Sequence, residues 1–203
     1  PSDVVVGADG AIYVTDWYDA RVGGHADHDN TLSGAIYRVA PKGFKSSVPR
    51  LDLETTAGQI TALKSNAANV RNLGFTRLQA QGAAALPAVE ALLKESKSYV
   101  AARAVFLLPH LGEAGVAATK KILSGDNARL RLAALRALRR SGQDILPLAA
   151  TLAKDPDAAV RRELATSLRD VPIEQAREHI VELARGYDGV DRTYLDALGI
   201  ACT

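Results

Sequence analysis

A repeat of 30 residues is the feature of this sequence that most constrains its fold. Valine or leucine recurs at this interval in two sets of positions, which are Val70, Val100, Leu130, Val160 and Val190, and Leu78, Leu108, Leu138, Leu168 and Leu198. Helix-breaking residues mark one matching place in successive units, at Gly82, Gly112, Gly142 and Pro172. A period of this length is typical of architectures in which one small structural unit stacks on the next.

Each unit contains two stretches with the apolar spacing of an amphipathic helix. Leu130, Ala133 and Ala134, for example, follow the i, i+3, i+4 spacing of one helix face. The helical pairs predicted in this way are 83–94 with 99–111, 113–123 with 127–140, 143–154 with 157–169, and 173–185 with 190–201. Because one such pair cannot bury both of its apolar faces, the pairs must stack on one another. The sequence therefore predicts a mainly α fold, a right-handed α-solenoid of about five helical hairpins over residues 56–203.

Residues 1–43 have a different character and read as part of a β-sheet. Runs of β-branched and aromatic residues at 3–6, 11–15 and 34–39 predict three short antiparallel strands. The Asp9-Gly10 pair between the first two runs favours a tight hairpin turn. Since so few strands cannot bury a core alone, we expect a small incomplete antiparallel blade, joined to the helices by a linker at 44–55.

The helical part resembles HEAT repeats in its turns. The segment 155–161, Asp-Pro-Asp-Ala-Ala-Val-Arg, is similar to the inter-helix turn and second-helix start of that family, and 69–71 and 126–131 are weaker copies. The resemblance implies that a turn aspartate and an arginine of neighbouring units pair as a ladder. The residues at these positions are Arg71, Arg131, Arg161, Asp126 and Asp155. The ladder would be interrupted at Val100-Ala101 and at Asp191-Arg192, which depart from the Val-Arg pattern.

The first 43 residues add a second resemblance. Residues 7–17, Gly-Ala-Asp-Gly-Ala-Ile-Tyr-Val-Thr-Asp-Trp, look like a propeller blade of the soluble sugar dehydrogenase or NHL type. Together with 34–43, the helical repeats and the ending 191–201, the layout resembles the large "membrane-bound dehydrogenase" proteins of Planctomycetes and Verrucomicrobia. In that family a propeller related to quinoprotein glucose/sorbosone dehydrogenases precedes HEAT repeats and often a cytochrome c domain.

The second resemblance carries expectations about the parent protein. The chain contains no methionine and opens in strand-like sequence, so we expect it to be a fragment holding the last blade and the solenoid. The parent is then expected to use a PQQ-like quinone, Ca²⁺ and haem c, with no cofactor in this fragment. A periplasmic or other extracytoplasmic location follows from the family alone.

The loop 16–30 is the chemically dense stretch of the sequence. Its candidate metal ligands are Asp16, Asp19, His25, Asp27, His28 and Asp29. Carboxylate oxygens with imidazole could bind Ca²⁺ or a transition metal at a redox site; the alternative is a solvated loop whose aspartates cap turns. Elsewhere no nucleophile, P-loop or zinc-protease motif occurs, and the single Cys202 excludes thiol-rich zinc and c-type haem sites. We therefore predict no catalytic residue in this chain.

Charge is uneven along the helical part. From Lys120 to Arg169 eleven basic residues oppose five acidic ones, whereas from Asp170 onward seven acids oppose three arginines. The candidate binding patch is formed by Arg129, Arg136, Arg139, Arg140, Arg162 and Arg169. Such a patch could hold a polyanion, a nucleic acid or an acidic protein, or be a solvated face. The lack of interleaved aromatic residues argues against nucleic acid.

Three functional hypotheses follow. The favoured one is a non-catalytic scaffold that binds a protein partner or a neighbouring domain of the same parent chain. The alternatives are a part in a redox or metal site through the 16–30 loop, and a nucleic-acid- or polyanion-binding HEAT module. No apolar run reaches the roughly 18 to 20 residues of a membrane span.

Overall fold

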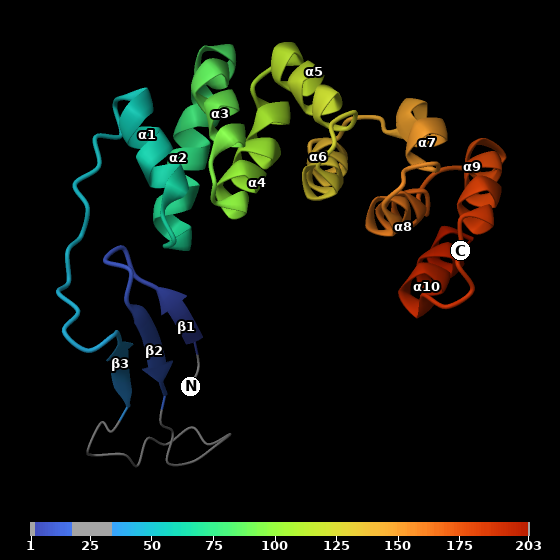
Figure 1. The fold of residues 1–203 in the computed structure, drawn as a ribbon. Helices are drawn as coiled ribbons and strands as arrows, with labels where there is room; N and C mark the ends of the chain where they lie inside the picture. The colour runs from blue at the N-terminus through green and yellow to red at the C-terminus, as the bar shows by residue number, and fades with distance from the viewer. Residues whose placement is uncertain (1–2, 18–33, 203) are drawn as a thin grey trace, which may run out of the picture. The chain divides into compact units, whose positions relative to one another are not determined.

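The structure, a computed structural model, describes residues 3–17 and 34–202 and is mainly helical with one small antiparallel sheet (Figure 1). The chain divides into two compact units, residues 1–80 and 81–203. The first unit contains the sheet, helix α1 (Thr56–Lys64) and all but the last residue of α2 (Ala68–Gln81).

The sheet has the strand order β1-β2-β3, with β1 at Asp3–Val6, β2 at Ile12–Asp16 and β3 at Ala35–Val39. Both pairings are antiparallel. Gly10 takes a φ of 85° in the turn between β1 and β2, a conformation that glycine adopts without strain. The Asp9 carboxylate accepts hydrogen bonds from the backbone N–H of Ala11, at 3.0 Å, and from the hydroxyl groups of Tyr13 and Ser46, at 3.1 and 2.7 Å. The predicted strands and hairpin turn are confirmed.

Both faces of the sheet expose apolar side chains. Successive residues of a strand point to opposite faces, and Val4 and Val5 of β1 are 59% and 49% exposed. On β3, Ile36 and Tyr37 are 74% and 54% exposed. The strands therefore pair correctly but bury little apolar surface among themselves.

Helices α1 and α2 pack closely within the first unit. A Cβ atom on Gly74 of α2 would lie only 2.4 Å from the backbone nitrogen of Leu63, so glycine is what permits this approach. Leu51 and Leu53 of the predicted linker pack against the buried side chains of these helices. The Gln59 amide also donates to the Leu53 carbonyl oxygen at 2.7 Å. The segment before α1 is thus fixed to the helical pair at its C-terminal end.

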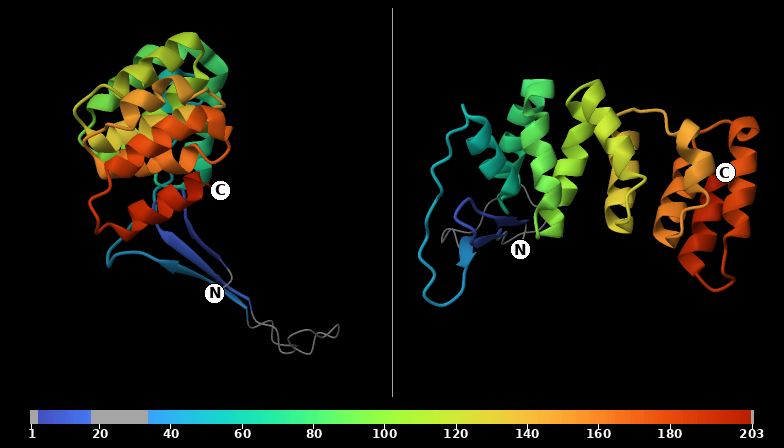
Figure 2. Two further views of the ribbon diagram at one scale, coloured as in Figure 1. Left: turned by 90° about the vertical axis from the view of Figure 1, so that its right-hand side faces the viewer. Right: turned by 45° about the horizontal axis from the view of Figure 1, so that its top comes forward.

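The second unit consists of helices that alternate between two rows. We call α3, α5, α7 and α9 the outer row and α4, α6, α8 and α10 the inner row, because the inner row lies on the concave side of this unit in Figure 1. Neighbouring inner-row helices contact one another along the whole series from α4 to α10. Figure 2 shows the same succession of helices from two other sides.

The inner-row helices α4, α6 and α8 begin 30 residues apart, whereas the starts of the outer-row helices vary around this interval. The outer row comprises α3 (Leu86–Ala91), α5 (Glu113–Ile122), α7 (Leu146–Leu152) and α9 (Ile173–Arg185). The inner row comprises α4 (Ser98–Leu107), α6 (Ala128–Arg140), α8 (Ala158–Ser167) and α10 (Arg192–Ala201). Three short 3₁₀ turns flank the helices of the first pair: Gly82–Ala85 (η1) before α3, Leu92–Lys94 (η2) after α3 and Leu108–His110 (η3) after α4.

Local sequence explains where the inner-row helices begin. Asn127, Asp157 and Asp191 stand at the N-caps of α6, α8 and α10, and each side chain accepts a hydrogen bond from a backbone N–H of the first turn. Pro87 and Pro147 lie in the first turns of α3 and α7, where the missing N–H is tolerated. The capped helices then bury leucine on their shared faces, and the core between α6 and α10 is built in this way.

The register fails in its last copy. Val160 is fully buried, but Val190 is 84% exposed, so the prediction that the final helix begins at residue 190 was wrong. The Asp188 carboxylate accepts hydrogen bonds from the backbone N–H groups of Val190 and Asp191, at 2.9 and 2.8 Å. These bonds hold Val190 in a turn, and Asp191 becomes the cap of α10.

Among the helices of the described residues, none is both long and apolar enough to span a membrane.

Candidate functional site

A buried ion pair links two successive turns of the second unit. Arg131 of α6 meets Asp155 in a bidentate arrangement, with Nε to Oδ2 and Nη2 to Oδ1 both at 2.8 Å. Nη1 of Arg131 donates to the backbone carbonyl oxygens of Gly125 and Asp126, at 2.9 and 3.1 Å. The two charged side chains are 8% and 6% exposed. The pair therefore ties the turn before α6 to the turn before α8.

Both members of this pair stay charged. Burial alone would raise the pKa of Asp155, because it disfavours the ionised carboxyl group. Hydrogen bonds from Arg131 and from the backbone N–H of Asp157 outweigh burial, so the pKa of Asp155 lies below its usual value of 3.8. The hydrogen bond to Asp155 likewise raises the pKa of Arg131. An ionised pair with satisfied hydrogen bonds serves here to hold the turns together.

Arg161 of α8 lies one repeat later and bonds to neutral oxygens. Its Nη1 donates to the carbonyl oxygen of Asp155 at 2.6 Å and its Nη2 to that of Gly186 at 3.2 Å. Its Nε donates to the Tyr194 hydroxyl at 3.2 Å, and that hydroxyl donates to the carbonyl oxygen of Leu183 at 2.8 Å. This arginine thus links the turns before α8 and α10 without a carboxylate.

The other two residues proposed for the ladder contribute locally. Arg71, in the first unit, donates to the carbonyl oxygen of Asn66 at 3.4 Å. Asp126 takes part through its backbone carbonyl group, which accepts from Arg131. Of the five residues proposed for the ladder, Arg131 and Asp155 are thus the two that form an ion pair between turns.

A hollow of about 420 Å³ crosses the inner row over α6, α8 and α10, and we call it the inner groove. Its apolar lining is Leu132, Ala159, Ala197 and Ile200. Its polar lining is Arg136, Arg162, Glu163, Thr166, Thr193 and Asp196. Three successive helices of the inner row thus contribute side chains to one surface.

Ion pairs between neighbouring helices border this groove. Arg136 of α6 donates from Nε to Oε2 of Glu163 on α8 at 2.7 Å. Arg162 of α8 donates to the Asp191 carboxylate and, at 3.0 Å, to the Thr193 hydroxyl group. The Thr193 hydroxyl, the first turn of α10 and Arg162 together lower the pKa of Asp191. The groove is therefore crossed by contacts that fix the spacing of its helices.

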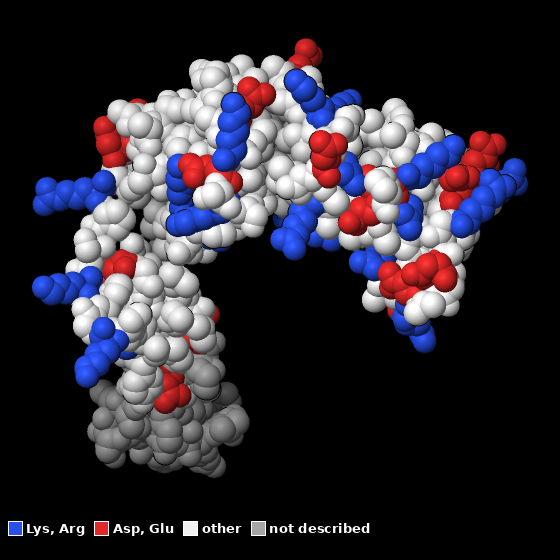
Figure 3. Space-filling model, viewed as in Figure 1, with Lys and Arg blue, Asp and Glu red and all other residues white. Residues whose placement is uncertain are grey.

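The remaining members of the predicted basic patch are Arg129, Arg139 and Arg140 on α6 and Arg169 just after α8. Arg139 is 3.4 Å from the Ser167 hydroxyl oxygen and 3.8 Å from Glu163, while Arg129 and Arg169 are exposed. Arg140 is exposed as well, at the C-terminal end of α6. Lys and Arg side chains gather below α6 on the concave side in Figure 3. The structure thus brings most of the predicted patch onto α6 and the facing side of α8.

Two aromatic residues of α4, Tyr99 and Phe106, lie against arginines, and the sequence analysis did not predict either contact. The Arg103 guanidinium lies 4.8 Å from the centre of the Tyr99 ring, and that of Arg140 lies 5.9 Å from the centre of the Phe106 ring. The 30-residue register places Phe106 in one row with three groove residues, Arg136, Thr166 and Asp196. Comparing equivalent positions across repeats, and not neighbours along the sequence, would have found it.

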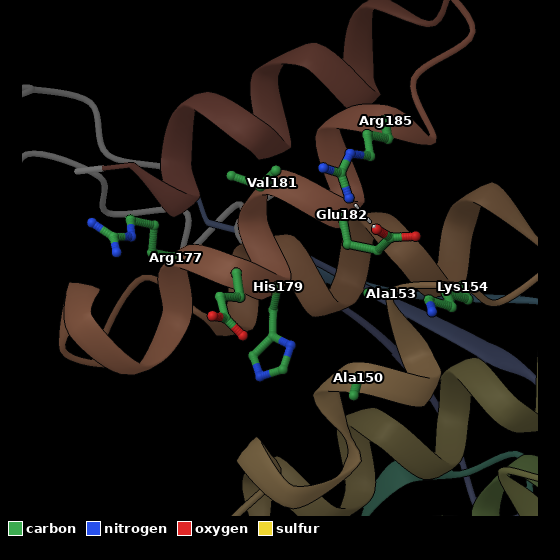
Figure 4. A pocket seen from close by; sticks show the side chains of 9 residues that line it. Ala150, Ala153, Lys154, Arg177, His179, Val181, Glu182 and Arg185 are labelled. Carbon is green, nitrogen blue, oxygen red and sulfur yellow. Dashed lines mark hydrogen bonds and ion pairs between the residues drawn. The ribbon is translucent and has the colours of Figure 1, made fainter.

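A second hollow, of about 470 Å³, lies between α7 and α9 on the outer row (Figure 4). It is lined by Ala150, Ala153, Val181, Lys154, Arg177, Arg185, Glu178, Glu182 and His179. Arg185 and Glu182 form an ion pair of 3.0 Å along α9. Basic and acidic side chains are nearly balanced here, so this hollow carries less charge selectivity than the α6 surface.

The predicted metal ligands lie almost entirely outside the described residues. Asp19, His25, Asp27, His28 and Asp29 fall in the segment 18–33, which the structure does not describe. Asp16 ends β2, where it pairs with Ala35. Within residues 3–17 and 34–202 no three His, Cys, Asp or Glu side chains are grouped as a metal site.

Comparisons with known proteins add little to this description. No protein-family model matches the chain, and no curated protein matches its sequence. The chain is similar to the crystal structure of an engineered protein from the Northeast Structural Genomics Consortium, at 18% identity and a TM-score of 0.41, over 72% of this chain and 77% of that one. A likeness of this size carries no argument about function.

Proposed function

We propose that residues 56–203 form a right-handed HEAT-type solenoid of about five hairpins that acts as a non-catalytic protein-interaction scaffold. The observation that carries the proposal is the inner groove, in which α6, α8 and α10 line one continuous hollow. Ion pairs such as Arg136 with Glu163 hold neighbouring helices at a fixed spacing. Repeat arrays present extended concave surfaces of this kind to their partners.

The sheet supports a place for this chain in a larger protein. Three strands with apolar side chains exposed on both faces need further structure to cover them. Trp17, directly after β2, is 70% exposed and would be covered in the same way. We propose that the sheet belongs to the last blade of a propeller dehydrogenase of the glucose/sorbosone type.

In such a parent protein the redox chemistry would belong to the other domains. A quinone and Ca²⁺ in the propeller and a haem c domain would transfer electrons, and the solenoid would position them or a partner, outside the cytoplasm. The metal-site alternative rests on residues 16–30, and no described contact favours it. A nucleic-acid function is disfavoured because Asp196 lines the α10 end of the groove and would repel the phosphates of a strand that runs along it.

Site-specific photo-crosslinking in the parent protein tests the scaffold proposal. A benzophenone side chain is placed at Thr166 in the inner groove or, as a matched control, at exposed Glu174 on α9 of the outer row. We expect Thr166 to crosslink to a defined polypeptide segment of another domain or partner, and Glu174 not to. Equal or absent crosslinking at both positions would contradict the proposal.

A further inference from the structure

We infer that the inner groove binds an extended protein segment with carboxylates at one end, apolar residues in the middle and a basic residue at the other end. The inference rests on the proposed scaffold function and names the chemistry of the partner. It follows from the order in which charge and apolar surface succeed one another from α6 to α10.

The α6 end of the groove favours carboxylates. Its exposed arginines outnumber the acids beside them, since Glu163 is the carboxylate that Arg136 and Arg139 share. The Arg136 side chain is still 51% exposed and that of Arg139 44% exposed while they face Glu163. An arginine carries several N–H donors in a planar fork, so Arg136, which lines the groove, can donate to a second carboxylate there, and Arg139 beside it adds positive charge.

The middle of the groove favours apolar side chains. Leu132 on α6, Ala159 on α8 and Ala197 on α10 form its lining together with Ile200, which is 41% exposed. Small alanine side chains between the larger leucine and isoleucine leave room for a leucine or a residue of similar size. Burying such a side chain supplies affinity that exposed ion pairs alone do not.

The α10 end favours a basic group. The charged residue that α10 contributes to the groove lining is Asp196, whose side chain is 59% exposed. Asp196 also pairs with Arg192 along α10, at 3.2 Å, and a carboxylate can accept from a second cation through its other lone pairs. Acidic side chains also lie over α10 in Figure 3.

The fold sets the length of the bound segment. Packed helix axes lie about 8 to 10 Å apart, so α6 and α10 are separated by roughly 16 to 20 Å. An extended chain rises about 3.3 Å per residue. The acidic and basic groups of the segment should therefore lie about five or six residues apart.

Synthetic peptides test this inference on the isolated chain by fluorescence anisotropy. The probe is fluorescein-labelled Glu-Glu-Ala-Leu-Ala-Leu-Lys-Lys, measured together with the same residues in reverse order, because the direction of the bound chain is open. The comparison peptides carry lysine at both ends, glutamate at both ends, or serine in place of leucine. We expect the better mixed-charge peptide to bind about tenfold more tightly than the lysine-only and the serine peptides.

Two substitutions sharpen the assay. Arg136→Glu should weaken binding of the mixed-charge peptide about tenfold, whereas Arg177→Glu, the same charge change on the outer row, should leave it unchanged. Asp196→Lys should reverse the preference, so that the glutamate-only peptide binds more tightly than the mixed one. Circular dichroism and thermal unfolding confirm that each variant remains folded.

The outcomes separate this inference from the scaffold proposal. Equal binding of the lysine-only peptide, or an unchanged preference in Asp196→Lys, overturns the charge pattern. Tighter binding of a single-stranded oligonucleotide than of any peptide overturns the assignment to a protein segment. If no peptide binds while Thr166 still crosslinks in the parent protein, the partner chemistry is wrong and the scaffold function stands.

Discussion

Replacing Asp155 with alanine should be one of the most destabilising single changes in the second unit. The substitution leaves the Arg131 guanidinium buried, with Nε and Nη2 deprived of their 2.8 Å partners. Removing one member of a buried ion pair costs about 3 to 5 kcal/mol of unfolding free energy. Arg131 keeps its bonds to the carbonyls of Gly125 and Asp126, so we expect the lower end, about 3 kcal/mol.

A double variant separates the cost of an orphaned charge from the value of the pair. Replacing both partners, as Arg131→Met with Asp155→Leu, removes the buried charges together and should cost about 1 kcal/mol or less. Unfolding free energies are measured in urea by circular dichroism at 222 nm. The control is Glu163→Ala, which breaks the more exposed ion pair with Arg136 and should cost under about 1 kcal/mol. A loss below about 1 kcal/mol for Asp155→Ala, or a double variant as unstable as the single one, would refute the reasoning.

Three further predictions test other parts of the account. The pKa of Asp155 is lowered from 3.8 in the folded chain, so the stability that its ionised form contributes is present above that pH and is lost as the pH falls through the folded pKa. The difference in unfolding free energy between the wild type and Asp155→Asn should therefore be constant above about pH 5 and shrink below pH 3.8 in acid titrations. Gly115→Ala should destabilise the folded chain by about 2 to 3 kcal/mol, because the new Cβ would lie 2.0 Å from the Leu108 carbonyl oxygen. Gly199→Ala, in open space on α10, should stabilise it by about 0.5 to 1 kcal/mol, and thermal unfolding of the two variants distinguishes them. Tyr194→Phe should cost about 1 to 2 kcal/mol in urea, since it removes a buried hydroxyl that both donates and accepts, and an unchanged midpoint would show that this link between turns is dispensable.

The 30-residue period predicted the helical pairs correctly where both the N-capping residues and the buried leucines recur at that interval. Asn127 and Asp157 cap α6 and α8 at the repeat interval, and Leu138 and Leu168, one repeat apart, are fully buried. At Val190 the interval persists in the sequence, but Asp191 is the N-cap and α10 begins at Arg192, two residues later than the interval predicts. The position of the capping side chain is a local effect that a hydrophobic period does not contain.

The candidate site was less accessible from the sequence than the fold. The arginines of α6 could be picked out by their density, but their partner Glu163 lies on another helix and only stacking brings it near. The inner groove likewise takes Leu132, Ala159 and Ala197 from three helices, and no contiguous motif records that set. Residues 18–33, which hold most of the predicted metal ligands, lie outside the described residues, so that hypothesis stays a prediction.

Cysteine accessibility in the parent protein tests the central claim, that the inner groove is occupied by protein, most directly. Thr166 and Glu174 are replaced singly by cysteine after the exposed Cys202 has been changed to serine, and the rate of maleimide labelling is compared between the isolated chain and the parent protein. The account predicts that labelling at Thr166 slows at least about tenfold in the parent protein while labelling at Glu174 does not change. Equal labelling rates at Thr166 in the two settings would contradict it.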